Sequence, residues 1–119
     1  MRRLPPALAA AATPVILELL GEPPASVVEI GFAGIHAVPL RLAGFDVTVV
    51  EPDPGQLERA RQRSGDDVLT NVPERDFDFA VMPEPGMSRE QSPGHVPTGR
   101  VRARHVVVVH LDGTASLEE

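Results

Sequence analysis

The residues best suited to chemistry in this chain lie between Val27 and Asp53. Gly31 and Gly34 follow an apolar run, and Glu51 ends the next apolar run, twenty positions after Gly31. Glycines let the backbone turn sharply and approach a ligand, and the N-terminus of the following helix points its N–H groups at the same place. A carboxylate at the end of the second run can accept hydrogen bonds from ribose hydroxyls. This spacing indicates a site for a nucleotide-type cofactor.

The remaining polar residues give weaker signals. The histidines do not have metal-ligand spacing on one helix face, so the sequence predicts no metal site. They are His36, His95, His105 and His110. His36 is the one to note, because it lies at the start of the helix that would face the cofactor. The arginines at 100, 102 and 104 alternate, and a solvated approach to a strand is favoured over a phosphate contact.

Strands and helices that alternate along the chain must position these residues. Apolar runs predict strands at 27–30, 46–50, 77–82 and 105–111, with a stub at 68–69. Helices are expected over 15–20, from 35–38 to 43, and from 54 to 63. Their expected N-caps are Thr13 and Asp53, and their expected stops are Gly21, Gly44 and Gly65.

This alternation predicts an α/β fold built on a doubly wound parallel sheet, a Rossmann-like three-layer sandwich. With strands counted along the chain, the expected order is 3-2-1-4-5. The ligand crevice should then lie at the C-terminal ends of the first and fourth strands, where the order reverses.

Length and composition limit the alternatives. With 119 residues the chain should form a single domain over 1–119, with a loose arm at 1–12 and a frayed tail at 112–119. A net charge of −6 argues against a nucleic-acid binder, and the absence of cysteine excludes thiolate metal sites and disulfides. No apolar run is long enough to span a membrane. A cytoplasmic protein is expected.

Two stretches resemble class I S-adenosylmethionine-dependent methyltransferases. They are Glu29-Ile30-Gly31-Phe32-Ala33-Gly34 and Val49-Val50-Glu51-Pro52-Asp53-Pro54, the second continuing through residues 56–61. The resemblance covers residues 25–82, and the short length makes the chain similar to an uncharacterised family of small archaeal methyltransferase-like proteins. It implies S-adenosylmethionine as the cofactor.

The resemblance also implies roles for individual residues. The cofactor-binding residues would be Glu29, Gly31, Ala33, Gly34, Glu51 and Asp67, with Asp66 as a near alternative to Asp67. Ile35 stands where the family has a further glycine, and such a side chain would crowd the ligand. Met82 stands where amide- and amine-modifying enzymes of the family carry an Asn or Asp before two prolines, so the expected hydrogen-bond acceptor is absent. Glu84 is left as a weak candidate base, and the catalytic residue is unknown.

Other functions remain open at this point. Gly31, Gly34 and Ala37 also fit a variant of the NAD(P)-binding loop, and a non-catalytic Rossmann-like interaction module is the third reading. Prolines interrupt residues 83–99, where a covering helix would normally lie. The strands at 77–82 and 105–111 are therefore expected to need a homodimer or a protein partner over one face.

Overall fold

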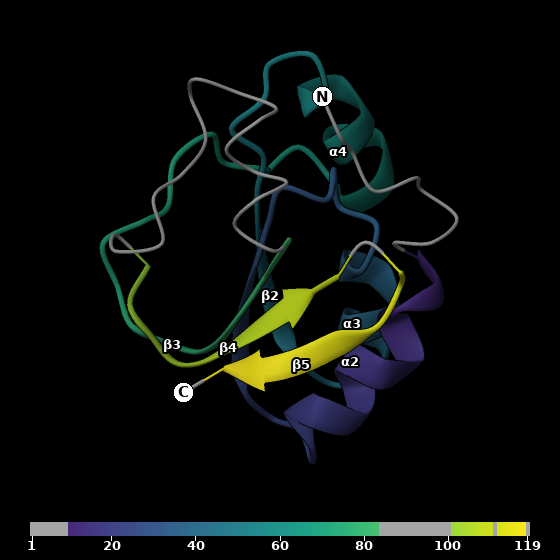
Figure 1. Cartoon of the computed structure of the whole chain (residues 1–119). Helices are drawn as coiled ribbons and strands as arrows, with labels where there is room; N and C mark the ends of the chain where they lie inside the picture. The colour runs from purple at the N-terminus through teal and green to yellow at the C-terminus, as the bar shows by residue number, and fades with distance from the viewer. Residues whose placement is uncertain (1–9, 84–100, 111, 119) are drawn as a thin grey trace.

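The computed structural model describes residues 10–83, 101–110 and 112–118. The helices in these ranges are α2 (Thr13–Leu20), α3 (Ala37–Leu42) and α4 (Leu57–Ser64). The strands are β1 (Ser26–Ile30), β2 (Asp46–Val50), β3 (Phe77–Pro83), β4 (Ala103–Val109) and β5 (Ala115–Glu118). Figure 1 shows how they are arranged.

The strands form one sheet in the order β2-β1-β3-β4-β5. The pairs β1–β2, β1–β3 and β3–β4 are parallel, and β5 pairs antiparallel with β4. The four main strands expected from their apolar runs therefore lie in one parallel part of the sheet, as strands buried on both faces should. β1 lies between β2 and β3, so the path of the chain across the sheet reverses there.

The two ends of the sheet differ from expectation. The stub at 68–69 is only an isolated bridge, in which Leu69 pairs with Val50 in the parallel direction. Residues 115–118, expected in a frayed tail, instead form β5. A tight turn makes this possible: the Asp112 carboxylate accepts hydrogen bonds from the Thr114 N–H at 3.0 Å and from its hydroxyl at 2.6 Å, and Gly113 has a φ of 85°.

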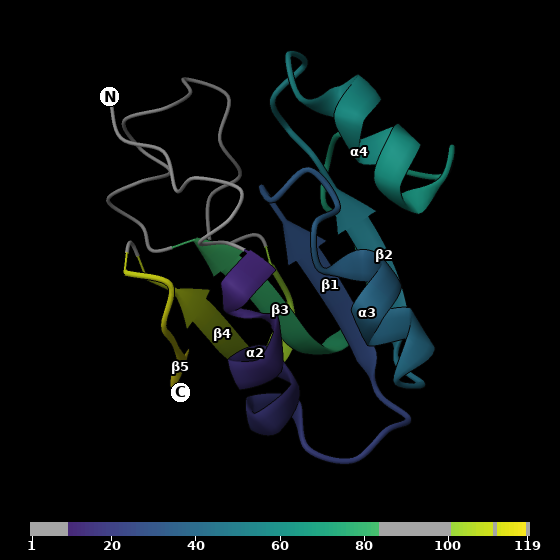
Figure 2. The ribbon, with the colours of Figure 1, turned by 90° about the vertical axis from the view of Figure 1, so that its right-hand side faces the viewer.

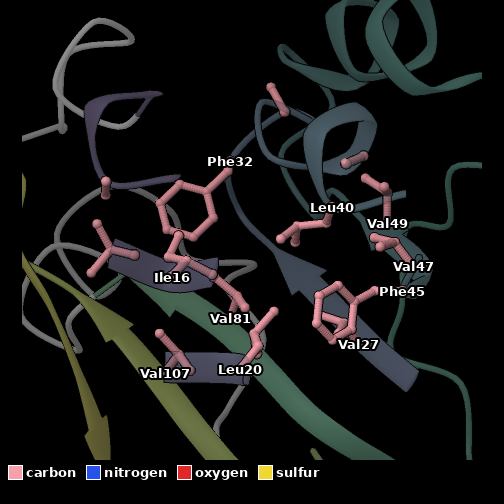
Figure 3. Close-up of a cluster of buried hydrophobic side chains, with 14 of the residues drawn as sticks. Ile16, Leu20, Val27, Phe32, Leu40, Phe45, Val47, Val49, Val81 and Val107 are labelled. Carbon is pink, nitrogen blue, oxygen red and sulfur yellow. The ribbon is translucent and has the colours of Figure 1, made fainter. Parts of the chain in front are cut away.

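All the described helices lie on one face of the sheet. Ile16 and Leu20 of α2, Leu40 of α3 and Ala60 of α4 belong to one buried cluster with alternate residues of the strands. Figure 3 shows Ile16 and Leu20 lying near Val81 and Val107 of the sheet, and Figure 2 shows α2 and α3 in front of the strands.

The opposite face carries a second cluster. Its described members come from strands and irregular segments, namely Val28, Ile30, Val50, Phe77, Ala80 and Met82, with Val72, Val101, Ala103 and Val106 packed against them. Within the described residues the molecule therefore has a helix layer and a sheet layer, and the third layer of the expected sandwich is not seen there.

The expected helix stops are correct, but the expected caps are not. Gly21, Gly44 and Gly65 end the helices with positive φ, a conformation that glycine adopts without strain. Thr13 lies inside α2 behind an Ala12 N-cap and makes no capping bond. Asp53 accepts a bond from the Gly55 N–H at 2.9 Å in a turn, and α4 begins only after Gln56.

Candidate functional site

The candidate site is built on the loop between β1 and α3, residues 31–36. Gly31 and Gly34 have φ values of 82° and 75°, and Ala33 is left-handed too, at 52°. The Gly31 N–H donates to the Val50 carbonyl at 3.1 Å, which ties the start of the loop to the end of β2. A Cβ on Gly34 would lie 3.3 Å from the Ala60 carbonyl oxygen, so α4 packs directly on this residue. Glycine is thus required at 34 for both conformation and space.

Glu51 meets this loop from the end of β2. One carboxylate oxygen accepts the Ala33 N–H at 2.8 Å, and the other accepts the Asp53 N–H at 3.0 Å. Only 3% of the residue is exposed. The structure therefore brings Glu51 and the glycine loop together, as the sequence predicts. The carboxylate also fastens the loop, which the sequence did not reveal.

Glu29 is a second carboxyl group under the same loop, and it is completely buried. Its Oε2 accepts the backbone N–H of His36 at 2.6 Å, whereas Oε1 has no hydrogen-bond partner among the described residues. Burial raises the pKa of Glu29 to about 7; the hydrogen bond from His36 acts in the opposite direction, and the nearby charge of Glu51 adds to the rise. Glu29 therefore has a different chemical character from Glu51.

His36 closes the loop with a buried side chain. Its Nδ1 shares a hydrogen bond with the Thr13 hydroxyl at 2.8 Å, and its ring meets Phe32 edge-on at 4.9 Å between centroids. Nε2 has no partner in the described part of the chain. Burial lowers the pKa of His36 to about 4, so the ring is neutral at physiological pH. Sequence reasoning noted His36 but assigned Thr13 to a helix cap; a threonine within an apolar helix was the available signal.

Two arginines complete the surroundings of the loop, and neither was expected in the site. Arg63 of α4 donates to the Ala33 carbonyl at 3.1 Å. Arg41 of α3 donates to the carbonyls of Ser64 at 2.8 Å and Val47 at 3.0 Å. These bonds join α3, α4 and β2 around residues 31–36. The loop is consequently held by side chains from several elements.

Asp66 and Asp67 lie in a turn, and both are exposed. The turn precedes Leu69, the residue that bridges to Val50. The contact of one of these acids with adenine stays a prediction. Ile35, whose side chain is expected to crowd a ligand, is partly buried against the cluster on the helix side of the sheet. Its side chain therefore contributes to packing.

The other candidates lie apart from the loop or outside the described residues. Met82 is buried in the cluster on the opposite face, and Glu84, His95 and Arg100 fall outside the described ranges. Arg102 forms an exposed ion pair with Asp76 at 3.0 Å. His105 packs against Phe79, and His110 bonds to Ser116 at 2.8 Å.

Residues 10–83, 101–110 and 112–118 contain no group of three or more His, Cys, Asp or Glu side chains placed to hold a metal ion. No helix within these ranges has the length and apolar character needed to cross a membrane. A scan against protein-family models gives no match to the chain, and a search of curated proteins gives none either.

Proposed function

We propose that the protein binds S-adenosylmethionine or a related nucleoside cofactor at the carboxyl ends of β1 and β2, and that methyl transfer is the reaction it would support. The observation that carries the proposal is the contact between Glu51 and the Ala33 N–H at 2.8 Å. It joins an acid at the end of one strand to a glycine loop at the end of its neighbour. In open α/β sheets, ligands bind where the strand order reverses, and β1 is that strand here.

The residues around the loop fit such a cofactor in part. Gly31 is exposed, and a Cβ placed on it would reach only ordinary contact with Pro83 at 3.6 Å, so the backbone is open to close approach there. An ionised carboxylate accepts hydrogen bonds only, so Glu51, at the end of β2 beside this loop, has the chemical character that a ribose hydroxyl requires. Ala33 and Gly34 shape the loop, whereas Glu29 is completely enclosed and would act from beneath it.

S-adenosylmethionine, when bound, would supply an electrophilic methyl group. Methyl transfer to a reactive nucleophile depends mainly on alignment, so a binding loop and an acid for the ribose are the parts a minimal enzyme needs first. No described residue qualifies as a general base at this site, and the acceptor of the methyl group is not identified by the residues present.

Titration calorimetry with S-adenosylmethionine, S-adenosylhomocysteine, NAD and NADP tests the proposal. We expect the first two to bind and the nicotinamide nucleotides not to bind. Glu51→Gln should weaken binding at least about tenfold, because a charge-assisted hydrogen bond contributes about 1.5–3 kcal/mol. Glu58→Gln, an exposed carboxylate on α4, is the matched control and should bind as the wild type does. Binding of NAD or NADP alone would replace the proposal with a nicotinamide-nucleotide domain.

A non-catalytic module is the second candidate, and the burial of Glu51 favours it. Both oxygens of Glu51 already accept backbone N–H groups, which suits a structural carboxylate that fastens a turn. In that case none of the four ligands binds. Glu51→Gln should lower the stability of the protein under either candidate, because both Glu51 oxygens hold backbone N–H groups. Calorimetry with the wild type therefore separates the two candidates, and thermal unfolding shows whether a loss of binding in Glu51→Gln reflects a loss of folding.

A further inference from the structure

One hydrogen bond, from the His36 N–H to the Glu29 carboxyl group, connects the two ends of the loop. Glu29 lies two residues before Gly31, and the His36 N–H that it accepts is at the end of the loop. The carboxyl group thus lies beneath the residues that form the candidate site. A change in the Glu29 side chain therefore acts first on the His36 N–H, at the end of residues 31–36.

The groups around Glu29 provide little support for a negative charge. Glu51 approaches from the end of β2 and repels it, while Arg41 from α3 and Arg63 from α4 attract it. Both arginines donate to backbone carbonyls, and no ion pair joins either of them to Glu29 within the described residues. The His36 ring is neutral, and α2 contributes the uncharged Thr13 hydroxyl, which bonds to that ring.

The two protonation states of Glu29 therefore place different demands on the loop. The neutral acid tolerates its enclosed position, with one oxygen bonded to His36 and the other without a described partner. A carboxylate in the same position leaves a charged oxygen unsatisfied, which costs several kcal/mol in a protein interior. Water relieves this cost when residues 31–36 move away from the sheet.

We propose that Glu29 is a proton-controlled latch: the neutral acid keeps loop 31–36 closed, and ionisation of Glu29 opens the loop and frees its backbone N–H groups. The latch itself is a property of the protein alone. Its consequence for ligand binding rests on the function proposed above, because the freed groups belong to that site.

Nuclear magnetic resonance can test the latch without any ligand. We expect the amide resonance of His36 to shift with a midpoint near pH 7, the pKa of Glu29, and the ¹³C resonance of the Glu29 carboxyl to titrate with it. Hydrogen-exchange protection at Ala33 and His36 should fall at least about tenfold between pH 6 and pH 8. Protection at Val28, in the centre of β1, should stay constant once intrinsic exchange rates are corrected for.

Variants identify the titrating group. Glu29→Gln should abolish the midpoint and keep residues 31–36 protected at pH 8, whereas Glu51→Gln should retain a midpoint at lower pH because a repelling charge is gone. The proposal is overturned by a constant His36 amide in the wild type, by a Glu29 carboxyl that titrates near its ordinary pKa, or by a midpoint that persists in Glu29→Gln. If Glu29→Gln does not fold, the ¹³C titration of the Glu29 carboxyl and the His36 amide shift in the wild type still test the proposal.

A binding experiment then connects the latch to the site. S-adenosylhomocysteine is the ligand of choice, because its sulfur is an uncharged thioether. Its affinity should rise at least about threefold from pH 6 to pH 8 in the wild type and stay constant in Glu29→Gln. Absence of binding at every pH would reject the proposed function and leave the resonance test of the latch intact. Binding without a pH-dependent change in the loop would reject the latch and leave the function intact.

Discussion

At the scale of single residues, two glutamates that look equivalent in the sequence play different parts. Glu51 accepts two backbone N–H groups, which stabilise a carboxylate. Glu29 accepts one and is completely buried, so its neutral form is favoured. The buried His36 beside it also favours its neutral form. Two groups beside the loop therefore favour their neutral forms. Glu29 ionises only at a higher pH than usual, and His36 is protonated only at a lower pH than usual.

These two groups should affect stability with opposite signs. The pKa of Glu29 is raised from 4.5 to about 7, so the folded state binds more protons and stability falls as pH rises through this window. The pKa of His36 is lowered from 6.5 to about 4, so stability falls as pH decreases through that window. Each change corresponds to about 3 kcal/mol, at about 1.4 kcal/mol per pH unit. In the wild type the two contributions nearly cancel between pH 4 and pH 7.

Variants that keep only one of the two groups should show a pH dependence of the free energy of unfolding that nearly cancels in the wild type. Glu29→Gln leaves the histidine contribution, so its free energy of unfolding should rise by about 3 kcal/mol from pH 4 to pH 6.5 relative to a Glu29→Gln/His36→Asn double variant. His36→Asn leaves the glutamate contribution, so its stability should fall by a similar amount from pH 4.5 to pH 7 relative to the same double variant. Urea unfolding followed by circular dichroism measures both. Parallel pH profiles for the two single variants would contradict this account.

At the scale of elements, the packing of α4 against the loop distinguishes Gly34 from other left-handed glycines. Gly21, at the end of α2, has nearly the same φ, 76° against 75°, but a Cβ there would meet nothing within 4 Å. At Gly34 the same Cβ would press on the Ala60 carbonyl oxygen and the Ser64 Oγ, both at 3.3 Å. Both positions therefore have a positive φ, and they differ in the space available for a side chain.

Alanine at these two glycines should separate strain from crowding. Gly21→Ala should cost about 1–3 kcal/mol, the penalty for a side chain in a sparsely populated backbone conformation. Gly34→Ala should cost more than Gly21→Ala by about 1–3 kcal/mol, the typical cost of overpacking. The chain has no Trp or Tyr, so denaturant unfolding is followed by circular dichroism. Equal costs at the two positions would mean that α4 moves away from the loop easily.

At the scale of the whole molecule, the valines of β4 are better covered than the sequence suggested. Val107 and Val109 are fully buried on the helix side, and Val108, on the opposite side, is only 4% exposed. Uncovered valines were the reason for expecting a homodimer or another partner over strands 77–82 and 105–111. That reason does not hold for these residues, and the partner itself stays a prediction that sedimentation can test.

β5 protects the edge of β4. It pairs with residues 106–109, of which three, Val107, Val108 and Val109, are buried, and leaves Leu117 partly exposed. A chain that ends after Gly113 would bare the N–H and C=O groups of a valine-rich strand, an arrangement that promotes edge-to-edge association. We expect the truncated chain to unfold at least about 4–8 °C lower, equivalent to about 1 kcal/mol, and to associate at micromolar concentration.

Sedimentation velocity and thermal unfolding of the full and truncated chains measure these effects. Ser116→Ala is the control, since it removes the bond to His110 but keeps the β5 backbone. A truncated chain that sediments and melts like the full one would show that β5 is dispensable.

Local chemistry determined much of this protein from the sequence alone. The strands follow from apolar runs buried on both faces, and Gly21, Gly44 and Gly65 end helices because the left-handed conformation favours glycine. The spacing of Gly31, Gly34 and Glu51 predicted that loop and acid would meet, because neighbouring parallel strands end at the same edge of the sheet.

Only the tertiary structure decided the rest, because it depends on contacts between residues distant in the chain. Thr13 bonds to His36, 23 positions away, instead of capping its helix. Glu29 and Glu51 have the same side chain, but Glu29 is completely buried and one of its oxygens has no hydrogen-bond partner among the described residues. β5 forms because a turn at Asp112 and Gly113 brings weakly apolar residues to an available edge of β4, and no local pattern encodes that edge.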